Sequence, residues 1–142
     1  MPLENFGSIL NFAEELESQD RQYYEAVAGN PACSDHKQMF EQFAANAKKN
    51  IATVQRTRRE NVTEMILEPI KGFVRAPYCE VCQAAPDMTL EDALAAAKRL
   101  EDRAVRYYNE AALKIKALPE VARALKLIAK KHNVHRDSLA AI

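Results

Sequence analysis

The chain has 142 residues, enough for one domain (residues 1–142) with a substantial hydrophobic core. Lys and Arg together number 20, as do Asp and Glu, and the resulting formal charge of zero argues against nucleic acid or an anionic membrane as the main partner. No apolar run reaches the ~18 residues of a membrane span, and the N-terminal segment lacks the features of a secretory signal. Three cysteines, an odd number, fit a reducing compartment, so we expect a cytoplasmic protein.

The first half of the chain predicts two amphipathic helices, because apolar residues recur at three- and four-residue spacing. The first helix spans about residues 6–28 and stops at Gly29. The second begins near Ser34, a suitable N-cap residue, and runs to about Leu67, shortly before a proline. The short connection between them predicts an antiparallel pair.

The second half predicts another antiparallel pair. Its first helix begins after Thr89, with acidic residues in the first turn where the helix dipole favours them, and its second begins at Pro119, a good first helical residue. Between the two pairs lies a stretch of about residues 68–89 that contains three prolines and shows no helical periodicity. Such a length is unusual for a loop and typical of a long crossover connection.

A repeated motif relates the two halves. The segment LESQDRQYYEAVA at residues 16–28 returns as LEDRAVRYYNEAA at residues 100–112, so that Glu101 follows Glu17 by 84 positions. Leu, Glu, Tyr, Tyr and Ala recur in register. Two duplicated helical hairpins joined by a long crossover predict an all-α, ferritin-like four-helix bundle, and a generic helical bundle is the alternative.

Each copy of the motif places one glutamate on an apolar stripe, where a carboxylate needs a partner or a metal. Ferritin-like bundles hold two metal ions with one Glu from each of two helices and a Glu-x-x-His pair from each of the other two. Glu17 and Glu101 fill the single-Glu positions. Aligning the other two helices at a shift of 85 puts the paired positions at 47–50, which reads Ala-Lys-Lys-Asn, and at 132–135, which reads His-Asn-Val-His.

The doubled Leu-Glu and Tyr-Tyr motifs resemble the rubrerythrin-like branch of the ferritin-like superfamily over nearly the whole chain. The resemblance implies a di-iron centre that reduces peroxide or activates oxygen, and a homodimer. The sequence departs from the family pattern, since Ala47 and His132 replace the bridging carboxylates. Asn50 replaces a histidine, and only His135 is as the family has it. The paired-CxxC rubredoxin module that supplies electrons in full-length rubrerythrins is also absent, which leaves the electron donor unknown.

Two divalent ions held close together repel each other, so a di-iron centre is not expected without the bridging carboxylates. Two carboxylates and two imidazoles remain, from Glu17, Glu101, His132 and His135, and Asp20 lies about one turn from Glu17. This set could bind one Zn²⁺, Fe²⁺ or Mn²⁺ in the bundle core. The alternative is a metal-free polar network in which the histidines form hydrogen bonds with the glutamates.

The cysteines suggest a second site. Cys79 and Cys82 form a CxxC motif in the crossover, and Cys33 and His36 form a CxxH motif before the second helix. In a ferritin-like bundle the crossover returns the chain to the end where the second helix begins, so the two half-motifs could meet as a Cys₃His structural zinc site. A redox-active dithiol and a set without a function are the alternatives.

Three functions are consistent with these residues. The first is a rubrerythrin-like metal-binding protein that has lost the di-iron centre and binds one metal in the core and zinc at the Cys₃His set. The second is a metal-dependent oxidoreductase acting on peroxide or oxygen. The third is a CxxC dithiol redox protein or a non-enzymatic interaction module. The missing bridging carboxylates favour a non-enzymatic metal-binding or interaction module over an enzyme, and no residue pattern indicates a substrate.

Overall fold

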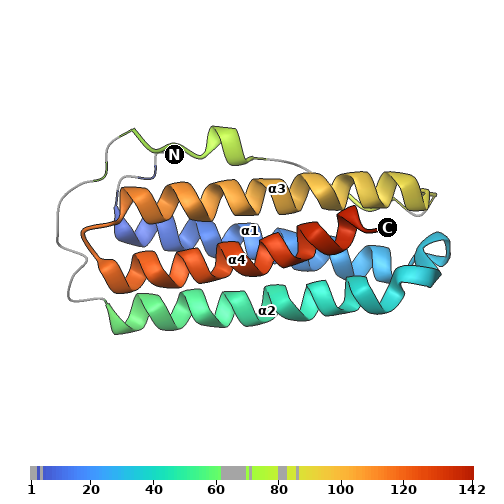
Figure 1. The fold of residues 1–142 in the computed structure, drawn as a ribbon, viewed down its shortest axis with the longest axis horizontal. Coiled ribbons are helices and arrows are strands. Elements are labelled where there is room, and N and C mark those ends of the chain that lie inside the picture. The colour runs from blue at the N-terminus through green and yellow to red at the C-terminus, as the bar shows by residue number, and fades with distance from the viewer. Residues whose placement is uncertain (1–2, 4, 62–69, 71, 80–82, 86) are drawn as a thin grey trace.

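Four long helices lie side by side along one axis in the computed structural model, which describes residues 3, 5–61, 70, 72–79, 83–85 and 87–142 (Figure 1). The helices are α1 (Phe6–Ala28), α2 (Lys37–Glu60), α3 (Leu90–Lys114) and α4 (Pro119–Ala140). Among the described residues, the short 3-10 helices η1 (Pro31–His36) and η3 (Ala76–Tyr78) lie in the connections before α2 and before α3. Within the described residues, no helix has the length and the apolar character to cross a membrane.

The bundle consists of two helical hairpins. α1 packs against α2 and α3 against α4, and the hairpins meet where α1 faces α3 and α2 faces α4. Figure 1 shows the described part of the connection lying along α3, and α3 starting at the end of the bundle where α2 begins. This long crossover confirms the predicted all-α, ferritin-like four-helix bundle.

Local signals set most helix ends where the sequence predicts them. The predicted starts of α3 and α4 are confirmed, and the Thr89 side chain caps α3 by accepting a hydrogen bond from the backbone N–H of Asp92. α1 begins after Asn5, whose side chain and that of Ser8 form a reciprocal capping box. The predicted bounds of the first helix, residues 6–28, are also confirmed.

The predicted N-cap of the second helix is wrong. Ser34 lies inside η1, and α2 begins three residues later, at Lys37. The reason is local: the Asn30 side chain accepts a hydrogen bond from the backbone N–H of Ala32, and Pro31 at the first position favours a helical turn there. The predicted end near Leu67 lies outside the described residues.

Aromatic packing holds the described part of the crossover against the bundle. The buried ring of Phe73 stacks on Tyr107 with centroids 5.6 Å apart, and that of Tyr78 meets the same tyrosine edge to face at 5.1 Å. The Tyr78 hydroxyl donates a hydrogen bond to Glu110 of α3. These contacts explain how the described part of the connection stays on the surface of α3.

The tyrosines of the repeated motif show that the hairpins are related by a pseudo-twofold axis. Tyr107 of α3 donates a hydrogen bond to the Ile9 carbonyl of α1 at 2.7 Å, and Tyr23 of α1 donates one to the Ala93 carbonyl of α3 at 2.9 Å. Tyr107 follows Tyr23 by 84 positions, and Ala93 follows Ile9 by the same number. Each hairpin therefore makes the same contact with the other.

This reciprocity predicts matched losses of stability. Tyr23→Phe and Tyr107→Phe should each lower the free energy of unfolding by about 1 kcal/mol, because each removes one buried hydrogen bond and keeps the ring. Urea denaturation of the two variants measures both values. A clear loss in one variant and none in the other would show that the two contacts are not equivalent.

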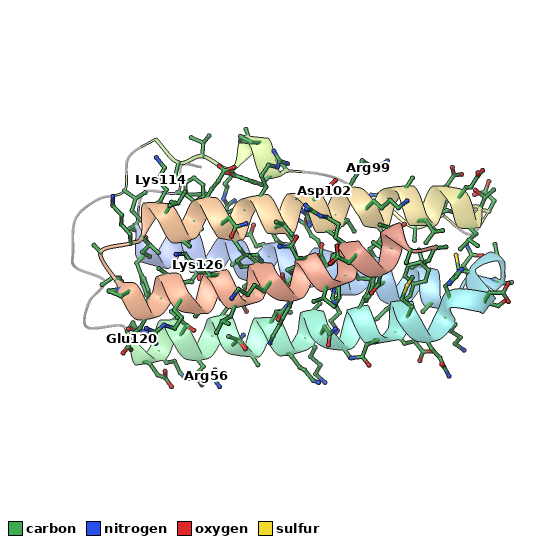
Figure 2. All side chains as sticks on the ribbon, viewed as in Figure 1. Arg56, Arg99, Asp102, Lys114, Glu120 and Lys126 are labelled. Carbon is green, nitrogen blue, oxygen red and sulfur yellow. The ribbon has the colours of Figure 1, made fainter. Side chains whose placement is uncertain are left out.

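Among the described residues the interior is mostly apolar. Charged residues such as Arg56 of α2 and Lys126 of α4 are exposed on the outside of the bundle (Figure 2). In contrast, a set of polar and charged side chains is buried around the middle of the four helices. These residues are Glu17, Asp20, Asn50, Glu101, Arg103, His132 and His135. Because burial of such groups is costly without partners, their contacts decide what the centre can do.

Candidate metal centre

His132 of α4 lies between the two glutamates of the repeated motif. Its Nε2 is 2.8 Å from Glu17 Oε2, and its Nδ1 is 3.0 Å from Glu101 Oε1. Both glutamates are completely buried, and the imidazole is 2% exposed. One ring therefore connects the carboxylate of α1 with that of α3.

His135 lies one turn further along α4 and faces the same carboxylate of α3. Its Nδ1 is 2.7 Å from Glu101 Oε1, and its ring stacks on Phe43 of α2 with centroids 4.0 Å apart. Its Nε2 is 2.8 Å from the side-chain nitrogen of Asn46. Ligand atoms of Glu101, His132 and His135 lie within 4.8 Å of one another, so the α3–α4 hairpin gathers two imidazoles and a carboxylate.

Two tyrosines fix the glutamates reciprocally. Tyr24 of α1 donates a hydrogen bond to Glu101 Oε2 at 3.0 Å, and Tyr108 of α3 donates one to Glu17 Oε2 at 2.8 Å. Burial, together with the negative charge of the accepting glutamate, raises the pKa of both tyrosines well above the ordinary value. Both hydroxyls therefore remain donors and hold the carboxylates in place.

The α1–α2 hairpin offers fewer ligands. Asn50 donates a hydrogen bond from Nδ2 to Glu17 Oε1 at 2.9 Å, as its counterpart His135 contacts Glu101. Ala47, the counterpart of His132, is buried and carries only a methyl group. The two halves of the centre have thus diverged, and the imidazoles belong to one hairpin.

A second group of ligand atoms lies on the α1 side of the same histidine. Glu17, Asp20 and His132 have ligand atoms within 4.8 Å of one another. Asp20 already has a cationic partner, since its Oδ1 accepts a hydrogen bond from Arg103 Nη2 at 2.7 Å, and both residues are 1% exposed. The spacing from Glu17 predicts Asp20 near the centre, whereas its partner Arg103 was not predicted.

Sequence reasoning missed two residues that contact the centre. Asn46 shows no signal, because a half-exposed amide on a helix is common. Arg103 does show one, since it lies three residues after Leu100 and four before Tyr107 on an apolar stripe of α3. A charged residue on such a stripe predicts a buried partner, which is Asp20.

The charges at the centre depend on one another. Burial alone would lower the pKa of His132, but the charges of Glu17 and Glu101 raise that pKa well above its usual value. Burial likewise disfavours an ionised Glu101, yet the two histidines lower its pKa to about 2. Burial and the nearby charge of Glu17 raise the pKa of Asp20 well above its ordinary value. In the metal-free protein the raised pKa of His132 favours the charged imidazolium beside the Glu101 carboxylate.

The donor set on the α3–α4 side could hold one divalent ion. The positions at which the family pattern expects bridging carboxylates hold Ala47 and His132. A metal ion about 2.0–2.2 Å from each ligand separates neighbouring ligand atoms by about 3.0–3.5 Å. Glu101 Oε1 lies 3.0 Å from His132 Nδ1 and 2.7 Å from His135 Nδ1, so a small outward movement would make room for an ion.

The structure does not bring the described members of the predicted zinc site together. Cys33 is buried among residues near the start of α3, whereas Cys79 is exposed and adjoins Tyr78, which packs further along that helix. Among the described residues, ligand atoms of Cys33, His36 and Cys79 are not found within 4.8 Å of one another. Cys82 lies outside the described residues, so the Cys₃His set as a whole, like the dithiol, stays a prediction.

The fold and the buried centre define a four-helix bundle protein whose core carries residues able to hold a metal ion. The family described as the ferritin-like domain matches residues 7–141. The chain belongs to this family. No curated protein and no solved structure matches the chain.

Proposed function

We propose that this protein binds a single Fe²⁺, Mn²⁺ or Zn²⁺ ion through Glu101, His132 and His135. The observation that supports the proposal is the convergence of these three ligand atoms within 4.8 Å of one another in a buried core. Two imidazoles and one carboxylate form a common ligand set for non-haem Fe²⁺, and three protein ligands with open positions also suit Zn²⁺.

The surrounding residues suit such a site. When Nδ1 of His132 faces the ion, its Nε2–H can donate to Glu17, which gives the carboxylate–histidine pair that often orients metal ligands. Tyr24 holds the second oxygen of Glu101. Next to His135, rotation of the Asn46 amide would present its oxygen to Nε2–H. Glu17 thus acts as a positioning residue rather than as a ligand.

The resemblance to the rubrerythrin-like branch supports an oxidoreductase acting on peroxide or oxygen. A bound Fe²⁺ or Mn²⁺ would supply the one-electron chemistry that such a reaction needs. The residues of this chain would bind and orient the ion, and Phe43, stacked on His135, would limit the access of water.

A specific observation favours a second candidate, a metal-free scaffold: the predicted ligand atoms already form hydrogen bonds with one another.

Metal content of protein purified without chelators separates the two candidates. We expect about one equivalent per chain in the wild type and less than about a tenth of an equivalent in His135→Ala, because two remaining ligands hold a divalent ion weakly. The matched control is His36→Ala, which removes a histidine outside the centre and should keep the metal. A wild type without metal after reconstitution with Fe²⁺, Mn²⁺ and Zn²⁺ would support the metal-free scaffold. Metal lost only in His36→Ala would point to the cysteine set.

A further inference from the structure

The buried ion pair between Asp20 and Arg103 lies beside the proposed metal site and is not part of it. Arg103 Nη2 is 2.7 Å from Asp20 Oδ1, and Arg103 Nη1 is 3.1 Å from Gln19 Oε1. A buried guanidinium is costly, and a buried ion pair contributes little net stability compared with apolar residues of similar size. A role in stability therefore does not explain why the pair is present.

The pair is also the point at which the internal symmetry fails. Arg103 follows Gln19 by 84 positions, and the position that corresponds to Asp20 is Ala104. The two hairpins share their glutamates and tyrosines, but only the α1 side of the centre carries an additional carboxylate and only α3 carries the guanidinium. The ligands are asymmetric too, because both histidines belong to the α3–α4 hairpin.

The α1 side would otherwise offer a good cation site. Glu17, Asp20 and His132 place ligand atoms within 4.8 Å of one another. Two further buried oxygens there, Asp20 Oδ2 and Asn50 Oδ1, have no hydrogen-bond partner among the described residues. Such an oxygen-rich set suits a hard divalent ion such as Mn²⁺.

We infer that Arg103 is a built-in cation that limits the centre to one metal ion. This inference rests on the proposed function. The guanidinium already pairs with Asp20, so one divalent ion would compensate the two remaining carboxyl groups of the centre, those of Glu17 and Glu101. A second divalent ion would leave two uncompensated positive charges in the core, next to the fixed guanidinium, where charges interact strongly.

The test is the number of Mn²⁺ ions bound per chain, measured by equilibrium dialysis and elemental analysis. The wild type should bind one, and Arg103→Gln, which copies the residue of the first hairpin, should bind two. Arg103→Lys keeps the charge and should bind one. The double variant Asp20→Asn/Arg103→Gln removes the additional carboxylate and should also bind one.

The outcomes distinguish this inference from the proposed function. A wild type with one ion and Arg103→Gln with one ion would overturn the inference and leave the proposed function intact. A wild type with no ion would contradict the proposed function, and a wild type with two ions would contradict the inference.

If Arg103→Gln does not fold, Asp20→Asn carries the test. Asp20→Asn leaves the buried guanidinium without a carboxylate partner. Its uncompensated positive charge repels the ion, so Mn²⁺ should bind at least about tenfold more weakly. Equal or tighter binding would overturn the inference. Asp20→Asn could also lose the metal because Asp20 is itself a ligand. In that case the double variant Asp20→Asn/Arg103→Leu would not regain the metal, and this result would overturn the inference as well.

Discussion

Replacing His132 by leucine is expected to abolish metal binding and to destabilise the metal-free bundle by about 3–5 kcal/mol. The imidazole is the only group that contacts both buried glutamates among the described hydrogen bonds, at 2.8 Å from Glu17 and 3.0 Å from Glu101. Leucine fills a similar volume but leaves two carboxylates facing an apolar side chain. Urea denaturation in the presence of a chelator measures the loss of stability, and dialysis against Mn²⁺ or Zn²⁺ measures the loss of metal.

Neutral partners provide the control for the His132 variant. If the loss comes from carboxylates without a cation, adding Glu17→Gln and Glu101→Gln to His132→Leu should recover a large part of it, because amides are less costly to bury than charges. Recovery of stability without recovery of metal binding is the expected combination. A His132→Leu variant as stable as the wild type without metal would mean that the imidazolium does not stabilise the centre.

The fold was predictable because local and repeated signals agree. The bounds of α1 and the starts of α3 and α4 follow from apolar periodicity, from the Thr89 cap and from Pro119. The doubled motif predicted that the two hairpins are related by duplication. The reciprocal hydrogen bonds of Tyr23 and Tyr107 agree with this relation. The 3-10 helix before α2 was missed, since Ser34 is as good a cap as Asn30 when only residue types are compared.

The centre was predictable as a set of residues but not as an arrangement. Stripe alignment brought Glu17, Glu101, His132 and His135 to one level of the bundle, and the structure places all four in contact. The bridging position of His132 depends on the rotamer of its side chain, and helical spacing carries no information about rotamers.

The stability of the metal-free protein should decline on both the acidic and the alkaline side, because Glu101 acts in one direction and the groups with raised pKa values, His132 and Asp20, act in the other. Glu101, with its pKa lowered to about 2, stabilises the fold above its unfolded pKa of about 4.3, and this contribution is lost as the pH falls towards 2. His132, with its pKa raised, stabilises the fold fully below its unfolded pKa of about 6.5, and this contribution is lost as the pH rises through the folded pKa.

The alkaline side of this profile should depend on the metal. The charged groups that face His132 are Glu17 and Asp20 from α1 and Glu101 from α3, while α2 contributes the neutral Asn50 next to Glu17. Above pH 6.5 unfolding releases the proton of the His132 imidazolium. The free energy of unfolding in chelator should therefore fall by about 1.4 kcal/mol per pH unit. A bound divalent ion replaces that proton, so its binding should release protons and tighten as the pH rises.

Urea denaturation between pH 5 and pH 9, with chelator and with excess Zn²⁺, measures both profiles. We expect the alkaline decline in chelator, its disappearance with Zn²⁺, and no decline of this size in His132→Leu under either condition. His36→Leu, which changes a partly exposed histidine outside the centre, should keep the wild-type profile. If the decline persists unchanged in His132→Leu, another group causes the alkaline effect. If excess Zn²⁺ leaves the decline in place, the ion does not replace the imidazolium proton.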